Sequence, residues 1–221
     1  MSNIVLTKSY EQPKFCKKEI MRYAGCKQSD NEVEELLDLC IKEVSNRLTY
    51  KVCYTVLDVN ITDSFCNFGL FRMQSKSLAV NLSDCSKAVL FAATVGIELD
   101  RLIARYGRIS PSKALMFQAI GAERIEALCD IICNDIEKEY RVNLKPRFSP
   151  GYADLLLETQ KDIFAVLDCP KRIGLSLNDS LLMSPSKSVT AFAGICDSIK
   201  KQTINKCSVC DKKDCNFRGL I

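Results

Sequence analysis

The chain has 221 residues, 47% of them hydrophobic and 26% charged, a composition typical of a globular protein with one large or two small domains. The 31 basic and 27 acidic residues leave a net charge of +4 that is spread along the chain, which argues against a nucleic-acid partner. The absence of histidine excludes Ser-His and Cys-His catalysis and any imidazole metal ligand from this chain.

The sequence contains no apolar run close to the roughly 20 residues that cross a bilayer. Its first residues lack the apolar core and small-residue cleavage site of a signal peptide. We therefore expect a cytoplasmic protein with no membrane partner. The 13 cysteines are too scattered for a disulfide scaffold, so most are expected to be reduced and buried.

The first half of the chain alternates between helical and strand patterns after an irregular start. Ser29 and Glu32 fit a capping box ahead of a helix whose apolar residues recur at helical spacing as far as Val44. A second helical pattern follows at 97–106, with Gly107 as its expected C-cap. Period-two alternation or short apolar runs predict three strands, at 50–59, 65–73 and 88–93.

The longest predicted helix opens with Ser110 and Pro111 and runs to about Tyr140. One apolar stripe can be read along it: Leu115, Ala119, Ala122, Glu126, Cys129, Cys133, Ile136 and Tyr140. Glu126 is the exception in this stripe, because an unpaired buried carboxylate costs several kcal/mol. Glu126 therefore either reaches water at the rim of the stripe or faces a ligand pocket, whereas the two cysteines are expected to pack in the core.

The last third of the chain begins with an ordered loop. Pro146, Pro150 and Gly151 favour an extended path rather than a helix. A helix is predicted at 157–167, and strands are predicted at 175–177 and 188–195 around a turn at 184–185. The irregular order of strands and helices predicts an α+β fold, a single domain with a mainly antiparallel sheet flanked by helices.

Three residues of this loop have the chemistry of a binding site. Arg147 can grip a carboxylate in bidentate fashion, Gly151 allows backbone to approach a ligand, and Tyr152 adds an amphipathic ring. The spacing Arg-x-x-x-Gly-Tyr alone also occurs in ordinary structured turns.

The wider sequence context favours the binding interpretation. RFSPGY, a helix, and then RIGLSLNDSLLMSPSKSVTAFAGI resemble the activation domain of cobalamin-dependent methionine synthase, whose Arg-x-x-x-Gly-Tyr loop binds S-adenosylmethionine. The upstream run SKAVLFAATVGIELDRLIARYGRISPSKALMFQAIGAERIEALCDII resembles short, free-standing members of that family. The resemblance covers about 84–195. We expect an N-terminal extension packing on the domain (1–28), the activation-like domain (29–196) and a cysteine-rich tail (197–221).

The resemblance implies an S-adenosylmethionine site. Arg147 would anchor the methionine carboxylate, and Glu126 aligns best with the family's site glutamate. The other implied binding residues belong to the loop: Ser149, Pro150, Gly151 and Tyr152. The chain departs from the family twice, because the family's N-terminal site aspartate has no evident counterpart and 193–198 supplies no tyrosine after the last strand.

The function implied by the resemblance is reactivation of a methyltransferase. Cob(II)alamin formed by accidental oxidation would be rescued by one-electron reduction and methyl transfer from S-adenosylmethionine, and the bond-making chemistry belongs to the cofactors. The cobalamin would come from separate methionine synthase modules and the electron from a flavodoxin or ferredoxin. Another corrinoid methyltransferase is an alternative partner.

The C-terminal tail contains a cluster of thiols. Cys207, Cys210 and Cys215 form a C-x2-C-x4-C array, with Cys196 as a candidate fourth ligand. Thiolates at this spacing can hold zinc or an iron-sulfur cluster, although four ligands are usual. Unliganded thiols or a disulfide are the alternatives. A metal-binding interaction or electron-relay protein on the same fold is accordingly the alternative function.

Overall fold

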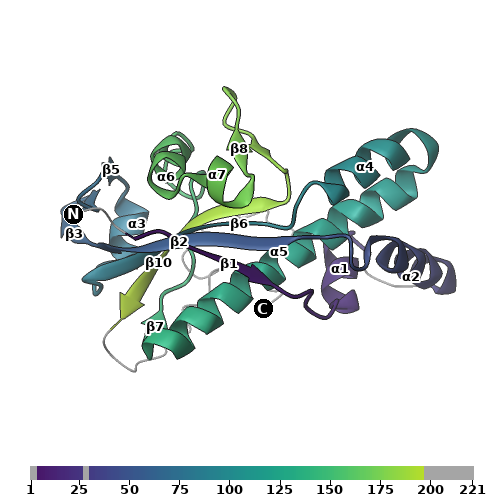
Figure 1. Cartoon of the computed structure of the whole chain (residues 1–221), viewed down its shortest axis with the longest axis horizontal. Helices are drawn as coiled ribbons and strands as arrows, with labels where there is room; N and C mark the ends of the chain where they lie inside the picture. Colours follow the sequence, from purple (N-terminus) through teal and green to yellow (C-terminus); the bar gives the residue numbers. More distant parts are fainter. Residues whose placement is uncertain (1–3, 27–29, 197–221) are drawn as a thin grey trace.

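A computed structural model describes residues 4–26 and 30–196. Its centre is an antiparallel sheet of five strands in the order β1-β2-β6-β10-β7 (Figure 1). The strands are β1 (Leu6–Tyr10), β2 (Tyr50–Asp58), β6 (Lys87–Thr94), β7 (Asn143–Leu144) and β10 (Ser188–Cys196). The long strands β2, β6 and β10 are buried over most of their length because both faces of the sheet are covered.

One face of the sheet is covered by the long helix α5 (Pro111–Tyr140). Three shorter helices pack against α5: α1 (Lys17–Tyr23), α2 (Asn31–Val44) and α4 (Glu98–Ile109). Since side chains alternate along a strand, every second residue of β2, β6 and β10 reaches this layer. Phe91 of β6 and Phe117 and Leu128 of α5 belong to its core. α5 therefore lies along the middle of the sheet, beneath it in Figure 1.

The opposite face carries smaller elements, which form a second hydrophobic core with Leu90, Ala92 and Phe192 of the sheet. Its helices are α3 (Lys76–Asn81), α6 (Thr159–Leu167) and α7 (Cys169–Ile173). Two small antiparallel sheets complete this side, β3 (Asn60–Thr62), β4 (Phe65–Asn67) and β5 (Arg72–Gln74) in one and β8 (Ser176–Leu177) and β9 (Met183–Ser184) in the other.

The predicted α+β architecture, an antiparallel sheet flanked by helices, is confirmed. The expectation of an irregular start was wrong, because β1 pairs with β2 at the edge of the sheet and α1 packs on α5. The predicted strand at 65–73 is a hairpin of β4 and β5 that turns at Gly69, where φ is +79°. No helix in the described residues is long and apolar enough to cross a membrane.

Two predicted helix caps differ from the structure. Asp30 caps α2, since its side chain accepts a hydrogen bond from the Val33 N–H at 2.9 Å. Gly107 does not end α4, which continues to Ile109.

The buried face of α5 is also rotated from the predicted stripe. Leu115 and Tyr140 are exposed, and Ala122, Glu126 and Cys133 are half-buried at the edge of the core. The charged residues that are truly buried are Glu123 and Arg124. The predicted stripe did not include this adjacent charged pair.

Candidate functional site

Arg147 lies in a loop that is fixed to the edge of the main sheet. Phe148 and Phe192 of β10 exchange backbone hydrogen bonds of 2.9 Å in both directions. One step earlier, the Lys145 N–H donates to the Gly194 carbonyl at 2.8 Å. The Arg147 backbone is therefore held between two attachments to β10, which gives its long side chain a defined origin.

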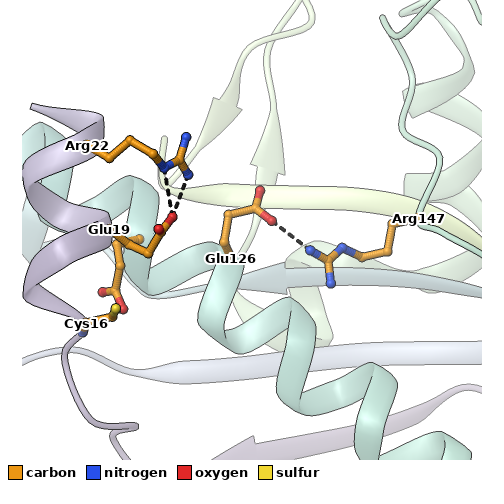
Figure 2. Close-up of polar contacts among 6 residues, drawn as sticks. Cys16, Glu19, Arg22, Glu126 and Arg147 are labelled. Atoms are coloured by element: carbon orange, nitrogen blue, oxygen red, sulfur yellow. Dashed lines mark hydrogen bonds and ion pairs between the residues drawn. The ribbon is translucent and has the colours of Figure 1, made fainter. Parts of the chain in front are cut away.

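The Arg147 guanidinium reaches across to two carboxylates of α5. Its Nη2 lies 2.7 Å from Oε2 of Glu126 (Figure 2). Its Nη1 donates to Oδ1 of Asp130. The two acids share one face because they are four residues apart on a helix. The Arg147 side chain is 17% exposed, whereas those of Glu126 and Asp130 are 46% and 64% exposed. The guanidinium is thus fixed at an open, charged surface.

The surroundings of Arg147 keep its guanidinium protonated. Burial by itself lowers the pKa of Arg147, but Cys129, Asp130 and Glu126 outweigh that effect and raise the pKa above its usual value. Burial raises the pKa of the Cys133 thiol, which lies beside Arg147. The local site therefore combines one permanent cation, two acids and neutral thiols.

The rest of the loop forms a compact turn beside Arg147. Gly151 has a φ of +83°, a conformation that favours glycine, and its N–H donates to the Leu155 carbonyl at 2.8 Å. The Tyr152 ring meets the Phe148 ring edge-on, with centroids 5.2 Å apart, and is 47% exposed. Ser149 is half-buried and Pro150 is buried. The turn thus presents an exposed aromatic ring close to a fixed cation.

Asp154 ties this turn to the N-terminus of α3. Its carboxylate accepts hydrogen bonds of 2.7 Å from the Ser75 hydroxyl and the Lys76 N–H, and one of 3.2 Å from the Ser77 N–H. Burial alone would raise the pKa of Asp154, but these hydrogen bonds hold it at about 2. The sequence pattern gave no role to this acid, and an Asp two residues after the Gly-Tyr pair was the available signal.

Helix α1 borders the site on the side opposite the loop. Figure 2 shows Glu126 between Arg147 and the α1 residue Arg22, which forms its own ion pair with Glu19 at 2.7 Å. Burial raises the pKa of Tyr23, and the negative charge of Glu126 raises it further, which places this ring in the same neighbourhood. The N-terminal segment therefore forms one wall of the site.

The start of α1 is held by the buried pair Glu123 and Arg124. Arg124 donates to the carbonyls of Pro13 and Lys14 at 2.5 and 2.7 Å and to both carboxylate oxygens of Glu123. Glu123 also accepts from the Cys16 N–H at 3.1 Å. Because both side chains are almost fully buried, this network fixes α1 against α5 beside Glu126.

A further cation lies on the same face of α5 as Glu126. Gln118, Ala122, Glu126 and Asp130 follow one another at four-residue spacing, and we call these four residues the α5 row. Lys187, directly before β10, donates from its ammonium to Oε1 of Gln118 at 2.5 Å. The α5 row thus has Lys187 at one end and Arg147 at the other.

The edge of β10 that pairs with β7 also binds the loop that carries Arg147. β7 pairs with β10 at Ile195 and Cys196, and the Phe148 bridge is at Phe192. Backbone groups two residues apart in an antiparallel strand point to the same edge. The N–H and C=O of Thr190 therefore point to the edge that Phe192 uses, between Lys187 and the loop.

Of the four cysteines predicted as metal ligands, only Cys196 lies within the described residues. Cys207, Cys210 and Cys215 lie outside the described residues. The Sγ of Cys196 lies 3.7 Å from that of Cys85, a partner that the sequence pattern did not suggest. Within 4–26 and 30–196, no group of three or more His, Cys, Asp or Glu side chains is placed to hold a metal ion.

Two surface hollows lie apart from Arg147. One, of about 710 Å³, has Asp154 and Leu156 in its wall, behind the turn, together with Arg72 and Lys76. The other, of about 600 Å³, lies near Asn46 and Tyr50. Neither of these two hollows is lined by Arg147 or Glu126.

Comparison with known proteins identifies the fold. No family model and no curated protein matches the sequence. Among solved structures, the chain is similar to the crystal structure of the MetH reactivation domain bound to AdoHcy, with a TM-score of 0.64 and 14% sequence identity over 89% of this chain and 80% of that chain.

The chain has the fold of the MetH reactivation domain. At 14% identity the similarity concerns the fold alone. The roles of Arg147, Glu126 and the loop residues therefore remain predictions, and the local geometry is the basis for the proposals below.

Proposed function

We propose that this protein binds S-adenosylmethionine on the α5 row and acts as a reactivation module for a separate cobalamin-dependent methionine synthase. The observation that carries the proposal is the Arg147–Glu126 pair, a fixed cation beside a half-exposed carboxylate. S-adenosylmethionine carries the complementary charges, a carboxylate and a sulfonium. The similar MetH domain was crystallised with AdoHcy, the demethylated form of the same ligand, which adds support.

Each side chain of the site has a defined task in this proposal. Arg147 binds the ligand carboxylate, because a guanidinium can form paired hydrogen bonds with it. Glu126 lies close enough to stabilise the sulfonium electrostatically. Gly151 and Tyr152 border the ligand, and the β10 attachments keep the loop from moving. The residues thus bind and orient the ligand, and none is required as a general acid or base.

The bound ligand supplies a methyl group. In the proposed repair, a flavodoxin or ferredoxin gives one electron to cob(II)alamin on the partner, the resulting cob(I)alamin accepts the methyl group, and the sulfonium becomes a neutral thioether. This chain aims the methyl group by holding the carboxylate at Arg147. A different corrinoid methyltransferase would place the same demand on these residues.

Calorimetry tests the binding proposal. We expect saturable binding of S-adenosylmethionine and S-adenosylhomocysteine, weakened roughly tenfold to a hundredfold by Arg147→Gln, because charged hydrogen bonds contribute about 1.5–3 kcal/mol. Arg108→Gln, in an exposed arginine near the end of α4, is the matched control and should bind as the unaltered protein does. Absence of binding by the unaltered protein at millimolar ligand contradicts the proposal.

The repair role needs a second assay. A cobalamin-dependent methionine synthase lacking its own activation domain would be oxidised to cob(II)alamin and mixed with this protein, S-adenosylmethionine and reduced flavodoxin. We expect the methylcobalamin absorption to appear only in the complete mixture. The same result with the Arg147→Gln protein would separate ligand binding at this site from the repair.

A second proposal concerns the tail, which follows directly on Cys196, whose sulfur lies 3.7 Å from that of Cys85. We propose that Cys196 and the tail cysteines Cys207, Cys210 and Cys215 hold zinc or an iron-sulfur cluster, which would make the chain a metal-binding or electron-relay protein. Metal and acid-labile sulfide analysis of anaerobically purified protein tests it. Protein free of metal and sulfide contradicts it, whatever the calorimetry shows.

A further inference from the structure

Lys187 is the second cation beside the α5 row, and its side chain packs against Gly121 of α5. A Cβ added at Gly121 would lie 2.7 Å from Cε and 2.8 Å from Cδ and Cγ of Lys187. The lysine stem therefore lies flat on the helix, where a larger residue would displace it. This close packing directs the ammonium to Gln118.

The distance between the two cationic ends suits one extended ligand. Gln118 lies about two helical turns before Glu126, which corresponds to roughly 12 Å along the α5 axis. That span is comparable with the length of an extended adenosyl amino acid. Ala122, the residue between them in the row, has a short, half-buried side chain that projects little from the helix.

The Lys187 end offers hydrogen-bond donors. The ammonium has three N–H groups and uses one for Oε1 of Gln118, and the Gln118 amide keeps its NH2 group as a donor. Burial lowers the pKa of Lys187, and Asp100 opposes that effect. A partly desolvated donor pair of this kind suits a ligand group with several acceptors.

We propose that Lys187 and Gln118 bind the adenosine end of the ligand whose carboxylate Arg147 binds. This inference rests on the proposed function and adds a specificity determinant to it. Ribose hydroxyls and adenine ring nitrogens are hydrogen-bond acceptors that Arg147 cannot reach from the other end.

The test uses two ligands and three variants of the full chain. S-adenosylhomocysteine carries both ends, whereas 5′-methylthioadenosine carries only the adenosine end. Lys187→Met keeps the stem on Gly121 and removes the ammonium. Lys171→Met, whose side chain is 83% exposed on α7, is the matched control, and Arg147→Gln reports on the carboxylate end.

We expect Lys187→Met to weaken the binding of both ligands roughly three- to tenfold, the contribution of one or two hydrogen bonds. Arg147→Gln should weaken S-adenosylhomocysteine and leave methylthioadenosine unchanged, since that ligand has no carboxylate. Lys171→Met should change neither.

Two results overturn the inference and leave the proposed function standing. The first is equal methylthioadenosine affinity in the Lys187→Met and unaltered proteins. The second is equal S-adenosylhomocysteine affinity in the Lys187→Met and unaltered proteins, because the donor pair then contributes nothing. Failure of the unaltered protein to bind either ligand overturns the proposed function and this inference together.

Discussion

Arg147 and Glu126 form an ion pair of 2.7 Å between a loop fixed to β10 and the middle of α5, although 20 residues separate them in the sequence. The pair brings the two charges that S-adenosylmethionine would need into one place. It also imposes a cost, because the ligand carboxylate must share a guanidinium that already has two acidic partners.

Glu126→Gln should reduce the discrimination between S-adenosylmethionine and S-adenosylhomocysteine. Both ligands carry an α-ammonium and an α-carboxylate, and only S-adenosylmethionine has the sulfonium charge, so loss of a carboxylate that faces the sulfonium weakens S-adenosylmethionine more. At about 5 Å in a water-like dielectric the charge interaction is just under 1 kcal/mol, so we expect the affinity ratio to fall roughly three- to fivefold. Calorimetry with both ligands measures the ratio, with Glu35→Gln on the exposed side of α2 as control. An unchanged ratio would show that Glu126 does not face the sulfonium.

Asp130→Asn should strengthen ligand binding. Asp130 occupies one guanidinium nitrogen and repels an incoming carboxylate, but its side chain is 64% exposed and its effect is screened by water. We therefore expect a gain of roughly two- to fivefold in the affinity for S-adenosylhomocysteine. The gain should be absent for methylthioadenosine, which has no carboxylate. Weaker binding of S-adenosylhomocysteine with unchanged binding of methylthioadenosine would mean that Asp130 orients Arg147 rather than competing for it.

The sequence predicted those residues of the candidate site that stand out by their local spacing. Arg147, Gly151 and Tyr152 follow a fixed spacing in the loop, and Glu126 stood out from a helical stripe even though that stripe was rotated from the true core face. Asp130 was missed because an acid on the exposed side of a helix looks ordinary, although its four-residue spacing from Glu126 was visible.

Other parts of the candidate site and of the fold depend on tertiary contacts that no local sequence pattern predicts. Lys187 reaches α5 from a turn, and only the tertiary structure places it over Gly121. The N-terminal elements were missed because β1 is an edge strand whose pattern is weak and α1 has one fully buried residue, Ile20. The burial of Arg124 likewise depends on the carbonyls of Pro13 and Lys14, more than 100 residues away.

Asp154→Asn should loosen the binding turn and destabilise the fold in a pH-dependent way. The folded pKa of about 2 lies below the ordinary value of 3.8, so the stabilisation is fully present above the ordinary value and is lost as the pH falls through about 2. At neutral pH we expect the free energy of unfolding to fall by about 1 kcal/mol, as for loss of a helix cap. Urea denaturation of both proteins at several pH values should show the difference shrinking below pH 3.8. A constant difference across that range, or an equal effect of Asp162→Asn on α6, would contradict this role.

Arg124→Met should destabilise the protein strongly, because it leaves the Glu123 carboxylate buried without its main partner. The side chains of Arg124 and Glu123 are 0% and 6% exposed, and removal of one member of a buried pair typically costs about 3–5 kcal/mol. The added change Glu123→Gln removes the stranded charge, so the double variant should recover part of the loss. Full recovery is not expected, since the Pro13 and Lys14 carbonyls also lose their donor.

Urea denaturation compares the three proteins. A single variant within about 1 kcal/mol of the unaltered protein would mean that water replaces the guanidinium and that α1 is not held by this network. In that case the wall of the site beside Glu126 would need another explanation.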